Sequence, residues 1–193
     1  MCGRYALHAN PEVVALQFGL DSVPEFKSSY NIAPAAEILV VRPAAAARAR
    51  WGLRGRFANL RAETVLAKFK RSGRCLVPAS GFYEWKAEGR RKQPYYFSPG
   101  SDALLALAAV WERETCSLIT TEPNAVVRTV HDRMPLIVPR TLYPAWLHGD
   151  ESLLESPPQI ELRAHPVGMA VNQAANDSPR LIEPVELARG LFD

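Results

Sequence analysis

The most restrictive feature of this sequence is a series of short β-favouring runs that are bounded by turn residues. Turn signals such as Ala79-Ser80-Gly81, Glu88-Gly89 and Pro99-Gly100 separate several of these runs. Short apolar and β-branched runs between such signals are typical of strands. We therefore expect strands at residues 38–41, 75–77, 82–85, 95–97, 104–111, 117–120, 136–138 and 160–163.

Helical patterns in the sequence are short. Asn10 and Pro11 favour the start of a helix as its N-cap and first helical residue, and Gly19 favours its end. The spacing predicts a helix over residues 11–18. Further short helices are expected near residues 64–69, 123–130 and 141–147.

The mixture of strands and short helices predicts the fold class. Residues 42–50 and 149–158 have the composition of surface connections rather than of domain boundaries. We expect an α+β fold, with a mainly antiparallel β core in the form of a distorted barrel-like sheet and short peripheral helices. A length of 193 residues fits one domain, which we place over residues 1–193.

Composition excludes several classes of protein. The hydrophobic fraction of 48% and the charged fraction of 22% match an average globular protein, and no apolar run is long enough to cross a bilayer, so no membrane partner is expected. The first residues lack the pattern of a secretory signal, which predicts a cytoplasmic protein. Three cysteines without a CxxC spacing indicate neither a disulfide framework nor a structural zinc site, and we expect no cofactor and no metal.

Cys2 is the residue with the most distinctive chemistry. Cys2 and Gly3 are small, so Met1 is expected to be removed, which leaves Cys2 with a free α-amine beside its thiol. The amine of such a 1,2-aminothiol condenses with an aldehyde to an imine, and the thiol then closes a five-membered thiazolidine ring. Ordinary pKa values of roughly 7.7–8.0 for the amine and about 8.5 for the thiol leave both mostly protonated at neutral pH, so neighbouring groups must move protons. Alternatively, Cys2 is a chance small residue after the initiator. Arg4 has the charge to hold an anionic group such as a phosphate.

Six blocks of the sequence, in order, resemble the SRAP family. They are Met1-Cys2-Gly3-Arg4-Tyr5, Tyr30-Asn31-Ile32-Ala33-Pro34, Arg50-Trp51-Gly52-Leu53, Asn59-Leu60-Arg61-Ala62-Glu63-Thr64, Arg74 to Lys86 (RCLVPASGFYEWK) and Val130-His131-Asp132-Arg133-Met134-Pro135. The resemblance runs from residue 1 to about residue 179. It implies an abasic-site processing protein that shields damaged single-stranded DNA, with a mainly β core, peripheral helices and a positively charged groove. Such a protein would associate with the nucleoid when bound to DNA.

The resemblance also implies catalytic residues. Cys2 corresponds to the crosslinking residue, Glu84 to the carboxylate that transfers protons, and His131 to a residue near the reacting sugar. Asn59 corresponds to a contact to the sugar or phosphate. An apolar setting for Glu84 would raise its pKa, which suits a general acid and base near neutral pH. The alternatives are a solvent-facing strand residue at Glu84 and a structural histidine at His131.

The same likeness implies DNA-binding residues. They are Arg4, Arg61, Asn31, Pro34, Trp51 and Phe57. The alternative for Arg61 is a salt bridge with Glu63, and the alternative for Asn59 is a turn residue. Family members typically have a longer, tryptophan-bearing loop where this chain has only residues 53–58, so Phe57 is the candidate replacement for a base-stacking platform. Cys75, Cys116, Trp85 and Trp111 are expected in the core.

The expected function is therefore capture of abasic sites in single-stranded DNA through a thiazolidine crosslink at Cys2. Lyase-type imine chemistry and hydrolytic removal of Met1 are expected to accompany it. We expect a monomer whose partner is single-stranded DNA containing abasic sites, with replication or repair proteins unspecified. Two alternatives remain: a hydrolase resembling glutamine amidotransferases with an N-terminal nucleophile, and a single-stranded DNA-binding module that forms no covalent bond.

Overall fold

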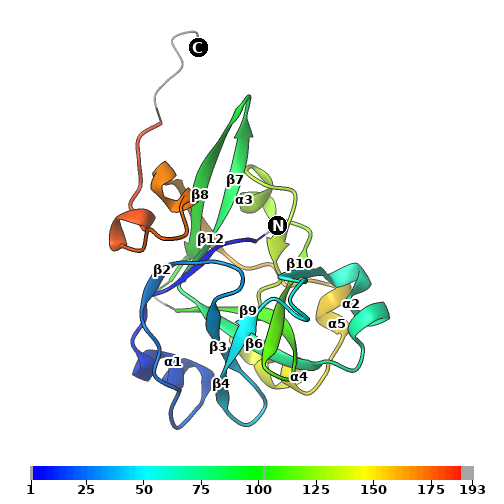
Figure 1. The fold of residues 1–193 in the computed structure, drawn as a ribbon. Helices are drawn as coiled ribbons and strands as arrows, with labels where there is room; N and C mark the ends of the chain where they lie inside the picture. Colours follow the sequence, from blue (N-terminus) through cyan, green and yellow to red (C-terminus); the bar gives the residue numbers. More distant parts are fainter. Residues whose placement is uncertain (1, 102, 188–193) are drawn as a thin grey trace.

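A ring of five strands forms the centre of the molecule (Figure 1), as seen in a computed structural model that describes residues 2–101 and 103–187. The strands of the ring are β3 (Glu37–Val41), β4 (Ala46–Trp51), β6 (Gly73–Ala79), β9 (Leu105–Glu112) and β10 (Thr115–Thr121). Around the ring, each strand pairs with the next in the order β10–β4–β3–β6–β9, and β9 pairs back with β10. Only the β10–β4 pairing within this ring is parallel. Two short strands, β5 (Asn59–Arg61) and β11 (Met134–Pro135), pair with β10.

A second, antiparallel sheet packs against this barrel. Its order is β12–β8–β7–β1–β2, and its strands are β1 (Tyr5–Leu7), β2 (Ser29–Ile32), β7 (Gly81–Glu88), β8 (Arg91–Pro99) and β12 (Leu162–Pro166). The chain passes from the barrel strand β6 into β7 with only Ser80 between them. Phe82 and Phe97, which are stacked with ring centroids 5.0 Å apart, join the same buried cluster as Leu76 and Val110 of the barrel. The two sheets therefore share one core.

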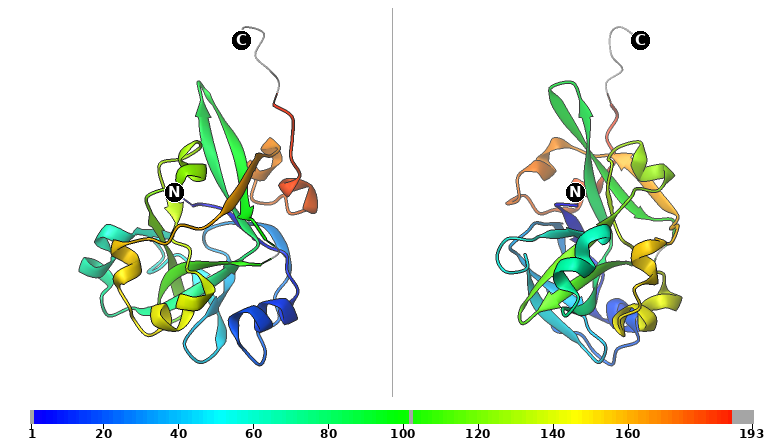
Figure 2. Two further views of the ribbon diagram at one scale, coloured as in Figure 1. Left: turned by 180° about the vertical axis from the view of Figure 1, so that it is seen from behind. Right: turned by 90° about the vertical axis from the view of Figure 1, so that its right-hand side faces the viewer.

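The helices are short and lie on the outside of the strands (Figure 2). They are α1 (Pro11–Phe18), α2 (Ala62–Phe69), α3 (Ala125–Arg128), α4 (Tyr143–Leu147) and α5 (Ser152–Glu155), with 3-10 turns η1 (Arg140–Leu142), η2 (Met169–Asn172) and η3 (Pro179–Ile182). In the described part of the chain, no helix has the length and apolarity that a membrane crossing requires.

The fold class and several elements confirm the sequence predictions. The protein is α+β, with mainly antiparallel strands that close into a distorted barrel. Helix α1 has the predicted bounds, with Pro11 in its first turn and Gly19 in the left-handed conformation at its end, with φ 67°. The side chain of Asn10, however, makes no capping hydrogen bond.

Other predictions from the sequence were wrong. Residues 42–50, expected to be a surface connection, contain most of β4, and residues 149–158 contain α5. The strand expected at residues 136–138 is displaced to β11, with Ile137 forming one isolated bridge to Leu107. Trp85 and Trp111 are only partly buried, whereas Cys75 and Cys116 are in the core as expected. Trp111 lies near the end of β9, where the Arg42 guanidinium stacks on its ring, 3.9 Å from the ring centroid, in place of apolar core residues.

Candidate active site

The start of the chain runs alongside β7, and this pairing positions Cys2. Tyr5 pairs with Phe82, Ala6 pairs with Gly81, and the Arg4 carbonyl accepts a hydrogen bond of 3.0 Å from the Tyr83 N–H. Continuing the antiparallel register toward the N-terminus brings Gly3 opposite Glu84. Cys2 is therefore next to the carboxylate that lies on β7, and its side chain is completely buried.

Asn59 holds Cys2 from the barrel side. Its side-chain Nδ2 donates a hydrogen bond of 2.7 Å to the Cys2 carbonyl. Asn59 begins β5, which pairs in parallel with β10, so its backbone is fixed by the barrel. The predicted catalytic residues Cys2 and Asn59, 57 positions apart in the sequence, are thus in direct contact.

Glu84 is buried beside this contact, with an exposed fraction of 1%. Burial raises the pKa of its carboxyl from 4.5 to about 7, because removal from water disfavours the charged form. The desolvation expected from its apolar neighbours is confirmed, and the alternative of a solvent-facing residue is wrong. A carboxyl with this pKa can both accept and donate a proton near neutral pH.

His131 faces Glu84 from the loop that follows α3. Its Nε2 lies 3.7 Å from Glu84 Oε2. His131 Nδ1 lies 3.0 Å from the Arg133 backbone N–H and 3.1 Å from the Arg133 carbonyl oxygen. These two contacts require opposite tautomers, so the backbone of Arg133 fixes the position of the ring rather than its tautomer. The Asp132 carboxylate is 3.1 Å from the same Nδ1, but its side chain is 89% exposed and solvated. Burial lowers the pKa of His131, so the imidazole is neutral at pH 7.

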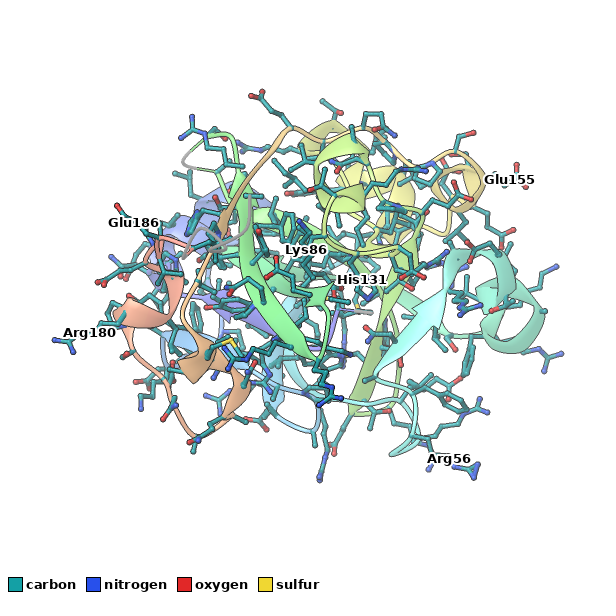
Figure 3. The ribbon with its side chains drawn as sticks, turned by 90° about the horizontal axis from the view of Figure 1, so that it is seen from above. Arg56, Lys86, His131, Glu155, Arg180 and Glu186 are labelled. Atoms are coloured by element: carbon teal, nitrogen blue, oxygen red, sulfur yellow. The ribbon has the colours of Figure 1, made fainter. Side chains whose placement is uncertain are left out.

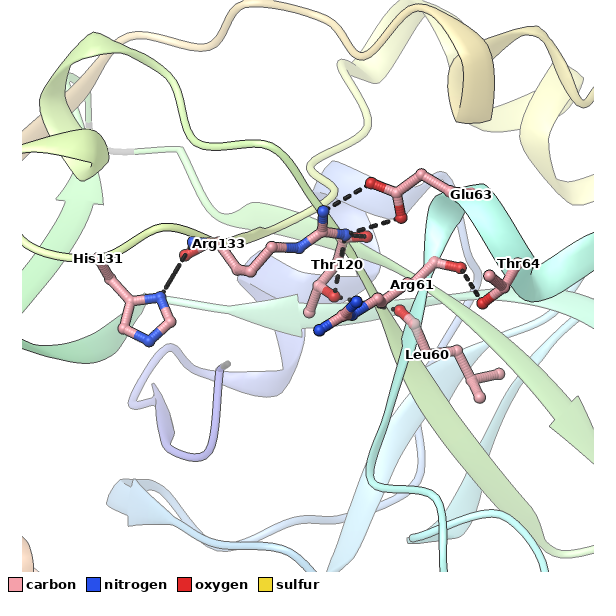
Figure 4. Close-up of polar contacts among 7 residues, drawn as sticks. All are labelled: Leu60, Arg61, Glu63, Thr64, Thr120, His131 and Arg133. Carbon is pink, nitrogen blue, oxygen red and sulfur yellow. Dashed lines mark hydrogen bonds and ion pairs between the residues drawn. The ribbon is translucent and has the colours of Figure 1, made fainter.

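An ion pair fixes the loop that carries His131, and the sequence reading missed it. Arg133 Nη1 and Nη2 donate to the two carboxylate oxygens of Glu63 at 2.6 and 3.1 Å, and Nη2 also donates to the Thr120 carbonyl at 2.6 Å (Figure 4). Hydrogen bonding from Arg133 lowers the pKa of Glu63. The proposed Arg61–Glu63 salt bridge is therefore wrong, and the exposed Arg61 side chain is directed elsewhere (Figure 4). In the sequence, the only indication of a role for Arg133 was its position in the same block as His131.

Arg4 and Asn31 lie together but are engaged within the protein. Arg4 Nη1 donates to Asn31 Oδ1 and to the Val171 carbonyl, both at 2.8 Å. Asn31 is buried, and its Nδ2 donates to the carbonyls of Gln173 and Asn176 at 3.0 and 2.7 Å. Asn31 therefore anchors the segment around η2, which is an internal role rather than the predicted DNA contact.

The predicted aromatic contacts are also internal. Trp51 is completely buried, its Nε1 donates to the Ala58 carbonyl at 2.8 Å, and its indole packs edge-on against Tyr5. Trp51 therefore has no surface for a DNA base, which corrects that prediction. Phe57 is partly buried and packs against Phe69, with ring centroids 5.7 Å apart.

Pro34 and the loop that carries Phe57 complete the predicted DNA-binding set. Pro34 is exposed in the turn after β2 and is open to contact. The short loop of residues 53–58 is tied to the barrel, because Arg54 donates to both carboxylate oxygens of Glu112 at 2.9 Å.

Chemically, the site brings together a thiol, a carboxyl and an imidazole. Across residues 2–101 and 103–187, no group of His, Cys, Asp and Glu has the arrangement of a metal centre. Burial, and then the negative charge of Glu84, raise the pKa of the Cys2 thiol. The thiol therefore stays protonated until a nearby base removes its proton, and Glu84 is placed to do so.

The raised pKa of Glu84 has a measurable cost in stability. The folded-state pKa of about 7 exceeds the ordinary value of 4.5. The contribution of Glu84 protonation to the free energy of unfolding is therefore fully present below pH 4.5 and is lost as the pH rises through 7. Glu84→Gln changes the free energy of unfolding by some amount at pH 4.5. We expect the change at pH 8 to be more stabilising than the change at pH 4.5 by on the order of 3 kcal/mol. Urea unfolding at both pH values measures this difference. The exposed Glu155→Gln is the control, and an equal effect of Glu84→Gln at both pH values would contradict the burial of a titrating carboxyl.

Known proteins resemble this chain over nearly its whole length. The sequence model of a family described as SOS response associated peptidase (SRAP) matches residues 1–174. The abasic site processing protein YoaM of Bacillus subtilis is 33% identical over 222 residues, covering 95% of this chain and 98% of YoaM. The abasic site processing protein YedK of Escherichia coli is 26% identical, covering 96% of this chain and 100% of YedK. A crystal structure of a protein from Bacteroides thetaiotaomicron has a TM-score of 0.81 at 21% identity, covering 96% of this chain and 100% of its own, and so shares the fold.

Proposed function

Because this chain belongs to the SRAP family, we propose that it captures abasic sites in single-stranded DNA through a covalent bond to Cys2. Its curated relatives, named as abasic site processing proteins, support abasic-site processing as the role. The observation that carries the covalent mechanism is the convergence of Cys2, Glu84, His131 and Asn59 at the start of the chain.

The first step of the proposed reaction forms an imine. Hydrolysis of the Met1–Cys2 peptide bond frees the α-amine of Cys2 as a maturation step. The Glu84 carboxylate takes a proton from the ammonium form, and the amine attacks the aldehyde carbon of the opened abasic sugar. Glu84 then returns the proton to the hydroxyl that leaves as water, and a C=N bond remains.

The second step closes the ring. The Cys2 thiol is still protonated at this stage, because burial and the charge of Glu84 raise its pKa. Its sulfur adds to the carbon of the C=N bond while its proton passes to the Glu84 carboxylate. The product is a thiazolidine, and the only other product of capture is one molecule of water. The amine therefore reacts before the thiol.

Asn59 and His131 have supporting roles in this proposal. The hydrogen bond from Asn59 to the Cys2 carbonyl restricts the terminus, so that the amine and the thiol stay beside Glu84. His131 Nε2 faces Glu84 Oε2 at 3.7 Å, so the neutral ring can take up a proton from the Glu84 carboxyl and, as imidazolium, deliver it when the thiazolidine ring reopens or when the sugar is released. Strand cleavage through the imine would use the same group.

The proposal has a direct test. The chain is mixed with a uracil-containing single-stranded oligonucleotide that a uracil glycosylase has treated, and the products are separated on a denaturing gel after heating. We expect a band in which chain and oligonucleotide migrate together, dependent on the glycosylase. If this band is absent while native gels still show binding, the protein is a single-stranded DNA-binding module that forms no covalent bond. Release of ammonia from glutamine would favour the amidotransferase-like alternative.

Arg61 is the predicted phosphate contact that the structure leaves exposed. Each phosphate that a protein neutralises on a single strand contributes about −0.7 to the slope of log affinity against log salt. We expect Arg61→Ala to reduce the magnitude of this slope by about 0.7, as measured with an undamaged single-stranded oligonucleotide.

A matched arginine provides the control for Arg61. Arg140 is exposed on η1, where it donates to the Leu16 carbonyl of α1. Helix α1 lies at the opposite end of the molecule from the β7–β8 hairpin (Figure 1). Arg140→Ala should leave the slope unchanged. Equal slopes for wild type and Arg61→Ala would exclude Arg61 as a phosphate contact.

A further inference from the structure

The β7–β8 hairpin projects from the body of the protein (Figures 1 and 2). We call residues 86–92 its tip. The strands stay paired to the end, with Lys86 opposite Gln93, Ala87 opposite Lys92, and Glu88 opposite Arg91. Gly89, with φ 60°, forms the turn. Residues 87–92 are all exposed.

The tip carries charge out of proportion to its size. It contains Lys86, Arg90, Arg91 and Lys92 against one acid, Glu88, so its formal net charge is +3. The whole chain also has a formal net charge of +3. The remaining residues therefore hold equal numbers of acidic and basic side chains, and the entire excess of positive charge lies on the tip.

The cations of the tip have no ion-pair partner in the described part of the chain, because none of the ion pairs there involves a side chain of the tip. Three consecutive cations, Arg90, Arg91 and Lys92, repel one another. A two-stranded ribbon that buries little apolar surface is only marginally stable by itself. Charge repulsion and exposure both oppose this ordered extension, and binding to a polyanion would offset them.

The tip is continuous with the candidate active site. Alternate residues of a strand share a face, so Glu84, Lys86 and Glu88 lie on one face of β7. At about 3.3 Å per residue, Glu88 is about 13 Å beyond Glu84 along the strand. Burial is the main cause that lowers the pKa of His131, and the charge of Lys92 adds to it, so the tip is within electrostatic reach of the site. Seen from above, Lys86 and His131 both lie near the middle of the molecule, whereas Arg56 and Arg180 lie at its rim (Figure 3).

We propose that the β7–β8 tip is a phosphate-binding arm that holds the nucleic-acid backbone beside the captured nucleotide. This inference rests on the proposed function for the identity of the strand in the active site. Because Glu88 is about 13 Å beyond Glu84 along β7, the tip is too far from the active site to contact the captured sugar. The arm therefore contacts phosphates that flank the abasic sugar rather than the sugar itself.

The chemistry of the tip favours a nucleic-acid backbone over an acidic protein. Specific protein interfaces have an apolar, well-packed centre. The exposed large hydrophobic residues of the described chain lie elsewhere: Val13, Leu16, Met169, Val185 and Leu187. The aromatic residue nearest the tip, Trp85, donates its Nε1 proton to Asn172 Oδ1 at 2.7 Å and is committed to the protein. Repeated phosphates match a row of cations without any apolar contact.

The test compares the triple variant Arg90→Gln, Arg91→Gln, Lys92→Gln with wild type on two abasic oligonucleotides. One has a single nucleotide on each side of the abasic site, and the other has ten. On the long oligonucleotide, we expect the magnitude of the salt slope to fall by about 2, because three cations each contribute about 0.7. On the short one, we expect no change in slope. Arg140→Gln is the matched control, and equal melting temperatures verify that the variant is folded.

The outcomes separate this inference from the proposed function. Slopes equal to wild type on the long oligonucleotide would overturn the arm, and so would an equal reduction on both oligonucleotides, which would place these cations at the sugar. The slope is measured on oligonucleotides in which a tetrahydrofuran analogue, which has no aldehyde, replaces the abasic sugar, so it is independent of covalent capture. A further outcome is that wild type forms no adduct while the tip variant still shows a smaller salt slope on the long oligonucleotide alone. That result would overturn the proposed covalent function and support the phosphate-binding arm.

Discussion

Replacement of Cys2 by Ala is expected to abolish the heat-resistant adduct with abasic DNA completely. The variant keeps an N-terminal amine, so an imine still forms, but it lacks the sulfur that closes the ring. An imine is hydrolysed when the protein is denatured in water, whereas a thiazolidine persists. The gel assay with the glycosylase-treated oligonucleotide measures the loss.

Two further variants sharpen this result. Cys2→Ser retains a hydroxyl in place of the thiol, and we expect only a labile adduct that survives denaturation when borohydride is added to reduce the imine. Cys75→Ala removes a cysteine that is equally buried in the core, and it should leave the adduct intact. A heat-resistant adduct at the wild-type level in Cys2→Ala would mean that another residue is the nucleophile.

Replacement of Glu84 by Gln is expected to slow capture by roughly 10²-fold or more, which is typical for loss of a general acid and base. Glutamine has nearly the same shape but neither accepts nor releases a proton. Because the ionised carboxylate begins the reaction, the wild-type capture rate should rise with pH through the pKa of Glu84 at about 7. This inflection should be absent from Glu84→Gln. Time courses of adduct formation from pH 5.5 to 8.5 measure both effects.

His131→Ala is the matched comparison for Glu84→Gln, since the two side chains face each other at 3.7 Å. Release is measured as transfer of the bound chain to a competing abasic strand. His131→Ala should change release more than capture, whereas Glu84→Gln should change capture. Capture by Glu84→Gln at the wild-type rate would show that Glu84 is not the proton shuttle.

Local sequence signals explain why parts of the fold were predictable. The Asn10-Pro11 start and the Gly19 end specify α1 through backbone preferences of single residues. Strand β4 was missed because its alternating Ala and Arg residues lack β-branched side chains, and its strand conformation comes from pairing with β3 and β10. The three-residue strands β1 and β5 depend on partners far away in the sequence.

The candidate site likewise has features that the sequence predicts and features that depend on tertiary packing. The resemblance to the SRAP family is confirmed. It was this resemblance that favoured a buried Glu84, because the alternating pattern of the strand also fits a solvent-facing residue, and Glu84 is buried. The inward position of Trp51 and the hydrogen bonds of Asn31 to residues 173 and 176 depend on tertiary packing that no local pattern encodes. The Arg133–Glu63 ion pair joins residues 70 positions apart, so it was also beyond a local reading.

Mass spectrometry of the chain after reaction with an abasic oligonucleotide tests the covalent role of Cys2 most directly. We predict an intact mass equal to the chain without Met1 plus the oligonucleotide minus one water, because ring formation releases one water. After digestion with trypsin and nuclease, the sugar remnant should be on the peptide that begins at Cys2. A remnant on any other peptide, or an adduct whose chain still carries Met1, would contradict the thiazolidine at Cys2.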